Sequence, residues 1–157
     1  MPTYEIIYSR IKTSDKEEKP ISNHAKAYEY LMRNCFTPET MWRESAWVVF
    51  LDKKNIPIGK FLLSTGGFDR TVLDIKLMAK AALDCNAEGI ILSHNHTTGE
   101  PKPSQADIEQ TKALKSAFHF LKIDLVDHII LTEEEYYSFS SEVTVKPPKT
   151  MAIVKAS

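Results

Sequence analysis

The most constraining feature of the sequence is a short apolar run, GIILS at residues 89–93, that leads directly into His94 and His96. A run of strand length without alternating polar positions is typical of a strand that is covered on both faces. Side chains two residues apart in an extended chain point to the same face, so both imidazoles can approach one ion. The chain is therefore expected to form a sheet with packing on both sides and polar groups at one edge.

Apolar periodicity along the rest of the chain indicates strands that alternate with helices. This alternation predicts an α/β fold in which a mixed β-sheet is flanked by helices. The expected elements, in order, are a strand at 4–9, a helix capped by Ser22 or Asn23, a hairpin of strands at 46–52 and 57–64, a helix at 74–86 capped by Asp74, the strand at 89–93, a helix at 105–121 and a strand at 125–131.

Composition excludes several classes of protein. The 157 residues are 43% hydrophobic, enough for the core of one ordinary domain. The net charge of −1 lacks the basic excess of proteins that grip a nucleic-acid backbone, so we expect no autonomous binding of nucleic acid. No apolar run approaches the roughly 20 residues of a membrane helix, so we expect no membrane attachment.

The first residues and the two cysteines favour a cytosolic protein. The opening MPTYEIIYSR has no apolar segment of the kind found in signal peptides. Cys35 and Cys85 do not form a CxxC pair, and both are interpreted as buried free thiols in a reducing compartment. A cytoplasmic location is the expectation that follows.

A turn rich in glycine and proline follows the two histidines and brings a carboxylate back towards them. Gly99, Pro101 and Pro103 shape the turn, and Ser104 and Asp107 open the next helix. Two imidazoles and one carboxylate form a three-ligand set that leaves a fourth position for water, as in catalytic zinc sites. Taken alone, Ser-x-x-Asp is more typical of a helix capping box. The two interpretations are compatible, because the serine can cap while the aspartate binds metal.

This constellation resembles the JAB/JAMM metalloprotease motif, also called MPN, in which an upstream Glu is followed by His-x-His-Pro and then by Ser-x-x-Asp, with seven residues between the second His and the Ser. Here the seven residues 97–103 separate His96 from Ser104. The bacterial RadC-like branch is more similar still, since it carries Asn between the histidines, a Ser-Gly-x-Pro-x-Pro-Ser-like loop and a downstream Asp-His. This chain has Asn95, GEPKPS and LVDHIIL. The resemblance covers roughly residues 40–142 and implies the cytidine-deaminase-like JAB/MPN architecture.

The resemblance implies a zinc-dependent hydrolase that cleaves a peptide, isopeptide or amide bond with metal-activated water. One Zn²⁺ per chain would be held by His94, His96 and Asp107. Glu44, just before the strand AWVVFLD, matches the family's acid and would act as general base. Glu88, just before GIILS, is a weaker rival for that role.

Three further residues are candidates for supporting roles. Ser104 can donate a hydrogen bond to the oxyanion of a tetrahedral intermediate, or can serve only as a helix cap. Asp127 and His128 can orient a ligand histidine, although strand alternation allows at most one of them to reach the site.

The sequence departs from the family pattern in two places, and the second bears on how the chain is divided. Thr97 and Thr98 replace the motif's Pro and Ser. Residues 1–40 lack the Gly-rich hairpin pair of the helix-hairpin-helix segment found in full-length RadC-like proteins. The expected division is an N-terminal strand and helix extension at 1–40, a RadC-like JAB/MPN domain at 41–142, and a C-terminal tail at 143–157.

Other functions remain open at this point. The chain could be a non-catalytic MPN-like module, or an accessory protein in DNA repair or mobile-element biology. A zinc deaminase would need H-x-E and P-C-x-x-C, which are absent. The complete ligand set with its Glu favours the enzyme. The sequence specifies neither the protein or peptide substrate, nor the oligomeric state, nor which divalent ion is bound.

Overall fold

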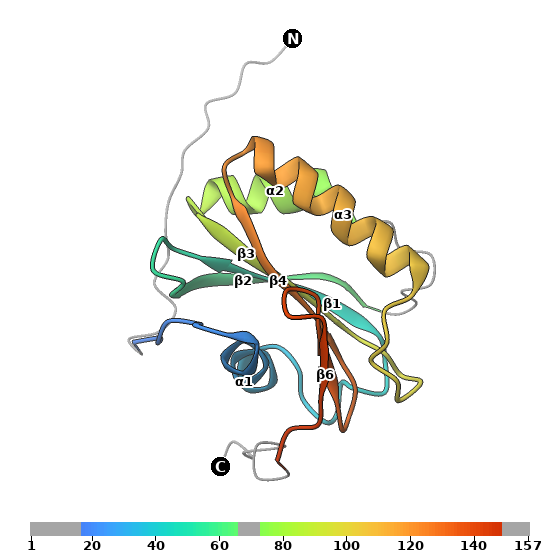
Figure 1. Cartoon of the computed structure of the whole chain (residues 1–157). Helices are drawn as coiled ribbons and strands as arrows, with labels where there is room; N and C mark the ends of the chain where they lie inside the picture. The colour runs from blue at the N-terminus through green and yellow to red at the C-terminus, as the bar shows by residue number, and fades with distance from the viewer. Residues whose placement is uncertain (1–16, 66–72, 149–157) are drawn as a thin grey trace.

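A computed structural model of the chain describes residues 17–65 and 73–148 (Figure 1). Its centre is one six-stranded sheet with the strand order β2-β1-β3-β4-β5-β6. The elements are α1 (His24–Asn34), β1 (Ser45–Leu51), β2 (Pro57–Thr65), α2 (Ile75–Asp84), β3 (Gly89–Asn95), α3 (Gln105–Phe120), β4 (Asp124–Leu131), β5 (Tyr136–Ser138) and β6 (Val143–Val145). The predicted α/β class with a mixed sheet is confirmed, and the strand expected at 4–9 lies outside the described residues.

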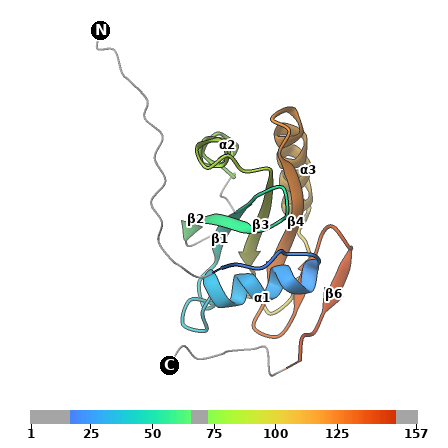
Figure 2. The same ribbon diagram turned by 90° about the vertical axis from the view of Figure 1, so that its left-hand side faces the viewer.

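Helices cover both faces of the sheet, with α2 and α3 on one side and α1 on the other (Figures 1 and 2). The strand at the centre, β3, is buried along its whole length. Its side chains alternate between the layers: Ile90 and Leu92 pack with α2 and α3, whereas Ile91 packs with α1. This alternation decides which side of the sheet each later residue of β3 faces.

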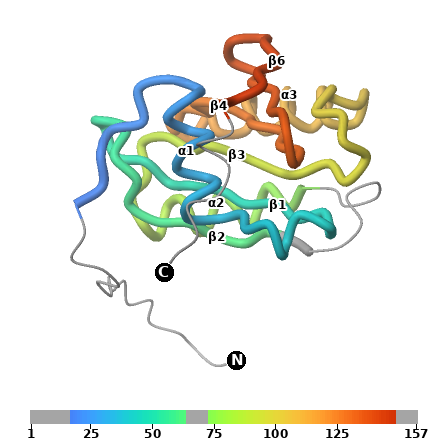
Figure 3. Tube along the Cα trace, turned by 90° about the horizontal axis from the view of Figure 1, so that it is seen from below, coloured from blue at the N-terminus to red at the C-terminus, as the bar shows by residue number. Residues whose placement is uncertain are grey.

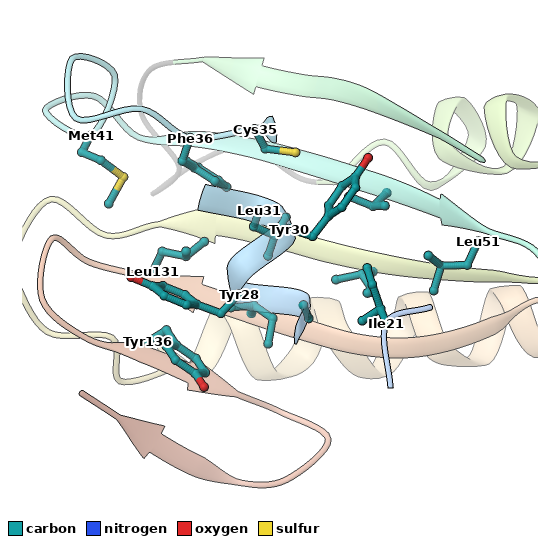
Figure 4. Close-up of a cluster of buried hydrophobic side chains, with 14 residues drawn as sticks. Ile21, Tyr28, Tyr30, Leu31, Cys35, Phe36, Met41, Leu51, Leu131 and Tyr136 are labelled. Atoms are coloured by element: carbon teal, nitrogen blue, oxygen red, sulfur yellow. The ribbon is translucent and has the colours of Figure 1, made fainter. Parts of the chain in front are cut away.

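The α1 side of the core is built from aromatic and aliphatic side chains. Figure 3 shows α1 lying across the strands, and Figure 4 shows the cluster beneath it. Tyr28 stacks on Tyr136 of β5 with ring centroids 4.4 Å apart. Leu31 and Phe36 are almost fully buried in the same cluster. Apolar burial on this scale holds the segment that follows α1 against the sheet.

Each helix begins at the residue that its sequence predicts. Asn23 accepts a hydrogen bond from the Lys26 amide at 2.9 Å, and Asp74 accepts one from the Leu77 amide at 2.9 Å. α2 ends at Asp84, two residues earlier than expected, because Asn86 adopts a left-handed φ of 54°. Cys85 caps this helix end and is only half-buried, whereas burial was expected.

The direction of the strands brings three chain segments to one edge of the sheet. β3 pairs in parallel with β4 and antiparallel with β1. The C-terminal ends of β3 and β4 therefore meet the N-terminal end of β1, and ligands in α/β sheets bind at this kind of edge. The prediction that the strand at 89–93 is central, with helices packed on it, is confirmed.

The far edge of the sheet was not anticipated. β5 and β6 are three-residue strands that pair antiparallel beyond β4. Residues 143–145 thus belong to the sheet, although the segment from 143 was expected to be a tail. Strands this short are held by pairing with a neighbour rather than by a periodic pattern of their own.

The packing of α3 on the sheet yields a stability prediction. Leu114 is fully buried between α3 and the sheet, so Leu114→Ala should lower the free energy of unfolding by about 2 to 5 kcal/mol. The matched control, Lys115→Ala, changes an exposed residue of the same helix and should stay within about 0.5 kcal/mol of wild type. Urea denaturation measures both, and equal effects would contradict the placement of α3.

Candidate metal centre

His94, His96 and Asp107 come together at the edge where β1, β3 and β4 meet. The ligand atoms of these three residues all lie within 4.8 Å of one another. His94 Nε2 lies 3.0 Å from His96 Nε2 and 3.3 Å from Asp107 Oδ1. The other carboxylate oxygen, Oδ2, lies 3.4 Å from His96 Nε2. The three residues proposed from the sequence therefore form one compact group.

A chain of hydrogen bonds fixes the tautomer of His94. The Thr111 hydroxyl donates to the Asp107 carbonyl at 2.6 Å, so its oxygen must accept the contact of 2.7 Å from His128 Nδ1. A neutral His128 that is protonated on Nδ1 can only accept on Nε2. It accepts from His94 Nδ1 at 2.8 Å. The Nε2 lone pair of His94 is thereby left pointing into the group.

His96 is held in the same tautomer by a different partner. Its Nδ1 donates to the Glu100 carbonyl at 3.0 Å, which leaves Nε2 with a lone pair. This bond also closes the turn after the motif, in which Gly99 takes a left-handed φ of 86°. Thr97, which stands where the family has proline, lies within a turn that this bond ties together.

Three acceptors thus converge on one point, an arrangement that requires a cation. Two imidazole lone pairs and a carboxylate repel one another unless a proton or a metal ion lies between them. With metal–ligand bonds of 2.0–2.1 Å, tetrahedral geometry spaces neighbouring zinc ligands about 3.3 Å apart. The two imidazole nitrogens lie 3.0 Å apart, and the carboxylate places Oδ1 3.3 Å from His94 Nε2 and Oδ2 3.4 Å from His96 Nε2, all close to that spacing. This group can hold a metal ion.

Burial and charge set the pKa values of the group. Burial lowers the pKa of His94, and it lowers the pKa of His128 well below its ordinary value. Burial opposes a charged His96, but contacts with Asp107 and the Glu100 carbonyl outweigh it and raise the pKa of His96. Burial likewise opposes a charged Asp107, but the two histidines and the Ser104 amide lower its pKa overall. Asp107 is therefore an anion at neutral pH.

Ser104 and Asp107 form the capping box that their spacing predicts. The Asp107 amide donates to Ser104 Oγ at 3.1 Å, and the Ser104 amide donates to Asp107 Oδ2 at 2.8 Å. Capping does not turn the carboxylate away, since both of its oxygens also face the histidines. The Ser104 hydroxyl uses a lone pair in this cap, so its hydrogen is not consumed by it.

Glu44 directly precedes β1, and the strand register carries it towards the histidines. Ala46 pairs with His94, so continuing the register places Glu44 beside His96 on the same face of the sheet. The Glu44 charge favours the protonated form of both motif histidines, although burial lowers the pKa of His94 overall. The rival acid, Glu88, directly precedes β3 and so lies at the end of that strand away from the histidines. Its Oε1 lies 3.7 Å from Lys53 Nζ.

Of the two residues of the downstream Asp-His pair, the structure brings only His128 to the histidines. The Asp127 side chain lies on the other face, where it accepts from Ser138 Oγ at 2.7 Å and the Ser140 amide at 2.9 Å. Asp127 thus ties β4 to the turn after β5. The expectation that strand alternation separates the pair agrees with these contacts.

The sequence did not identify two of the residues that complete the site. Thr111 was not among the predicted site residues, although its position four residues after Asp107 places both on the same face of α3. Asn95 was noted only as a feature of the resemblance. Its side chain faces away from the metal group, and its partners lie in the irregular segment before β1.

The sheet order and the site together define a JAB/MPN-type domain with a candidate metal centre. Residues 21–144 match the family described as the RadC-like JAB domain. The chain therefore belongs to the RadC-like JAB domain family, as the resemblance predicted. The matched range begins before α1 and ends within β6.

Curated relatives at this level of similarity are bacterial UPF0758 proteins. One from Flavobacterium johnsoniae is 46% identical over 99 residues, which cover 63% of this chain and 43% of that protein. One from Coprothermobacter proteolyticus is 36% identical over 128 residues, which cover 80% of this chain and 54% of that protein. A third, from Thermotoga maritima, is 34% identical over 122 residues, which cover 78% of this chain and 53% of that protein. The chain thus spans about half the length of these relatives.

Within residues 17–65 and 73–148, no helix has the length and apolar character needed to cross a membrane.

The buried imidazole of His128 predicts a pH dependence of stability. The folded protein keeps this ring neutral because its pKa is lowered, whereas the unfolded chain takes up a proton below the ordinary value of 6.5. The unfolded state then binds more protons, so stability falls as the pH falls. Between pH 7 and pH 5 this contribution is about 2 kcal/mol.

Urea unfolding of metal-stripped protein at several pH values tests this effect. His128→Gln should lose about 2 kcal/mol less than wild type between pH 7 and pH 5. His119→Gln, which removes an exposed histidine from α3, should keep the wild-type dependence. Parallel curves for wild type and His128→Gln would show that His128 is not held neutral.

Proposed function

We propose that this chain is a zinc-dependent hydrolase that cleaves a peptide, isopeptide or amide bond. The observation that carries the proposal is the convergence of two Nε2 lone pairs and the Asp107 carboxylate beside Glu44. Zinc is the ion of choice because it favours imidazole nitrogen and accepts carboxylate. Three protein ligands leave room for a water molecule and a substrate oxygen, as catalysis requires.

In this proposal His94, His96 and Asp107 hold the ion, and His128 keeps His94 in the tautomer that binds it. A bound zinc ion polarises water and a substrate carbonyl. Glu44 accepts a proton from the attacking water and passes it to the leaving amine nitrogen. The Ser104 hydroxyl donates a hydrogen bond to the oxygen of the tetrahedral intermediate.

The same features favour an enzyme over a non-catalytic module. A scaffold would need neither three converging acceptors nor an acid that approaches them from another strand. A DNA-repair role rests on the family name alone, and the net charge of −1 gives it no support. The substrate of the proposed hydrolase is a protein or a peptide.

The ligand assignment predicts a metal content. Protein purified without chelator should carry close to one zinc ion per chain, measured by inductively coupled plasma mass spectrometry. His96→Ala should carry much less, because loss of one of three ligands removes a large part of the binding energy. His119→Ala, the control on the exposed side of α3, should retain the ion. Equal zinc in wild type and His96→Ala would rule out the ligand set.

The assignment of Glu44 predicts a loss of activity without a loss of metal. Glu44→Gln should keep the zinc and the fold, and should slow hydrolysis on the order of 10²-fold or more, the scale of one general acid–base group. The assay is hydrolysis of a library of peptide and isopeptide substrates by the zinc-loaded protein.

The matched control for Glu44→Gln is Glu88→Gln, since each acid stands directly before a buried strand. Glu88→Gln should retain full activity because its strand end lies away from the metal group. Loss of zinc in Glu44→Gln would instead make Glu44 a ligand, and full activity would remove it from the mechanism.

A further inference from the structure

Asn95 stands between the two motif histidines but faces the opposite side of the sheet. Its side chain is fully buried. The Ser45 amide donates to Asn95 Oδ1 at 2.7 Å. Asn95 Nδ2 donates in turn to the carbonyls of Arg43 at 3.0 Å and Met41 at 3.2 Å. One amide group thus uses its acceptor and both of its donors on a five-residue segment that is distant in sequence.

These three bonds enclose Glu44. They engage the carbonyl of the residue before it and the amide of the residue after it. The segment is also anchored by the Met41 side chain, which is buried in the cluster under α1 (Figure 4). The backbone of Glu44 is therefore fixed on both sides, while its side chain is directed to the face that carries the histidines.

We propose that Asn95 is a positioning residue, which holds the backbone on both sides of Glu44 so that the carboxylate meets the metal group. We call these three hydrogen bonds, which join Asn95 to the Ser45 amide and to the Arg43 and Met41 carbonyls, the Asn95 clamp. The catalytic consequence of the clamp rests on the proposed function, whereas its existence does not. The strand that supplies the two histidines thereby also sets the position of the proposed base.

Few other side chains could form this clamp. It requires one acceptor and two donors on a single short planar group, which only an asparagine of this length provides. An aspartate would keep the acceptor but would set a carboxylate against the Arg43 and Met41 carbonyls. An alanine would leave two carbonyls and one amide without their partner, each at a substantial cost when buried.

Ser93 offers a matched control on the same strand. It is fully buried and, lying two residues before Asn95, faces the same side of the sheet. Among the described residues its Oγ has no hydrogen-bond partner. Ser93→Ala therefore removes a buried polar group from the same face without removing a contact to the Glu44 segment.

Amide hydrogen exchange tests the clamp without any assay of function. In Asn95→Ala the Ser45 amide should exchange about tenfold faster or more, the scale of a lost buried hydrogen bond. The amides at the centres of β3 and β4 should be unchanged. Ser93→Ala should leave the Ser45 amide at the wild-type rate. Wild-type exchange at Ser45 in Asn95→Ala would overturn the proposal.

A measurement on the wild-type protein covers the case in which Asn95→Ala does not fold. The side-chain amide hydrogens of Asn95 should exchange at least about tenfold more slowly than those of Asn86, which is exposed. Equal rates would overturn the clamp in the same way.

The link to Glu44 is tested with zinc-loaded variants. Asn95→Ala should keep one zinc per chain and lower kcat about tenfold or more with little change in KM, because the base is displaced rather than the ligands. Asn95→Asp, which keeps the acceptor but sets a carboxylate against the Arg43 and Met41 carbonyls, should lower kcat at least as much as Asn95→Ala. In the Glu44→Gln background, Asn95→Ala should cause no further loss.

Two results would overturn the positioning role: loss of zinc in Asn95→Ala, or an equal further loss of activity in the Glu44→Gln background. If the wild-type protein hydrolyses none of the substrates, the proposed function fails, and the exchange experiment still decides the clamp. The two failures are therefore distinguishable.

Discussion

β1 runs antiparallel to β3 with Ala46 opposite His94, and this register sets where Glu44 lies relative to the histidines and to Asn95. A shift of β1 by one residue would turn Glu44 to the face of the sheet that carries Asn95, because side chains alternate along a strand. The register is held by burial on both sides of β3, where Leu92 belongs to one core and Ile91 to the other. The apolar packing of the domain thus determines the geometry of a polar site at its edge.

Hydrogen bonds outside the ligand set orient the side chains of the polar site. The contacts of His128 with Thr111 and of His96 with the Glu100 carbonyl each fix a tautomer. Both nitrogens that face the group therefore carry lone pairs in the neutral protein. Rotamers and protons that are already fixed do not have to be fixed during binding, and this order raises affinity. Hydrogen bonds outside the ligand set commonly tune metal sites in this way.

The sequence predicted the parts of the structure that depend on local patterns. GIILS is apolar throughout because it is covered on both faces, and Asn23, Asp74 and Ser104 cap helices through their own side chains. The strands β5 and β6 escaped prediction because each has only three residues and depends on its neighbours, since β5 pairs with β4 and β6 pairs with β5. Glu44 was found through the resemblance, since nothing in its neighbourhood indicates which strand end it approaches.

The residues that support the metal group, His128 and Thr111, could not be assigned their contacts from the sequence. Because side chains alternate along a strand, the sequence predicts that Asp127 and His128 point to opposite faces of the sheet. It does not predict which of the two contacts His94, because that depends on the pairing of β4 with β3 and on the position of α3. Thr111 has the spacing of a core residue, and its hydroxyl gains a role only once His128 lies beside it. Both roles depend on contacts between segments that are distant in the chain, and such contacts cannot be predicted from the local pattern of a single sequence.

Asp107 shows how one residue can serve both the fold and the site. Its Oδ2 closes the capping box at the N-terminus of α3, where the helix dipole stabilises negative charge. Both oxygens nevertheless face the histidines, so the anion is held in place by the start of the helix that crosses from β3 to β4. A module that used this domain only as a scaffold would gain no stability from burying an anion against two imidazole lone pairs. Retaining that arrangement is physically favourable when a cation occupies the point where the three acceptors meet.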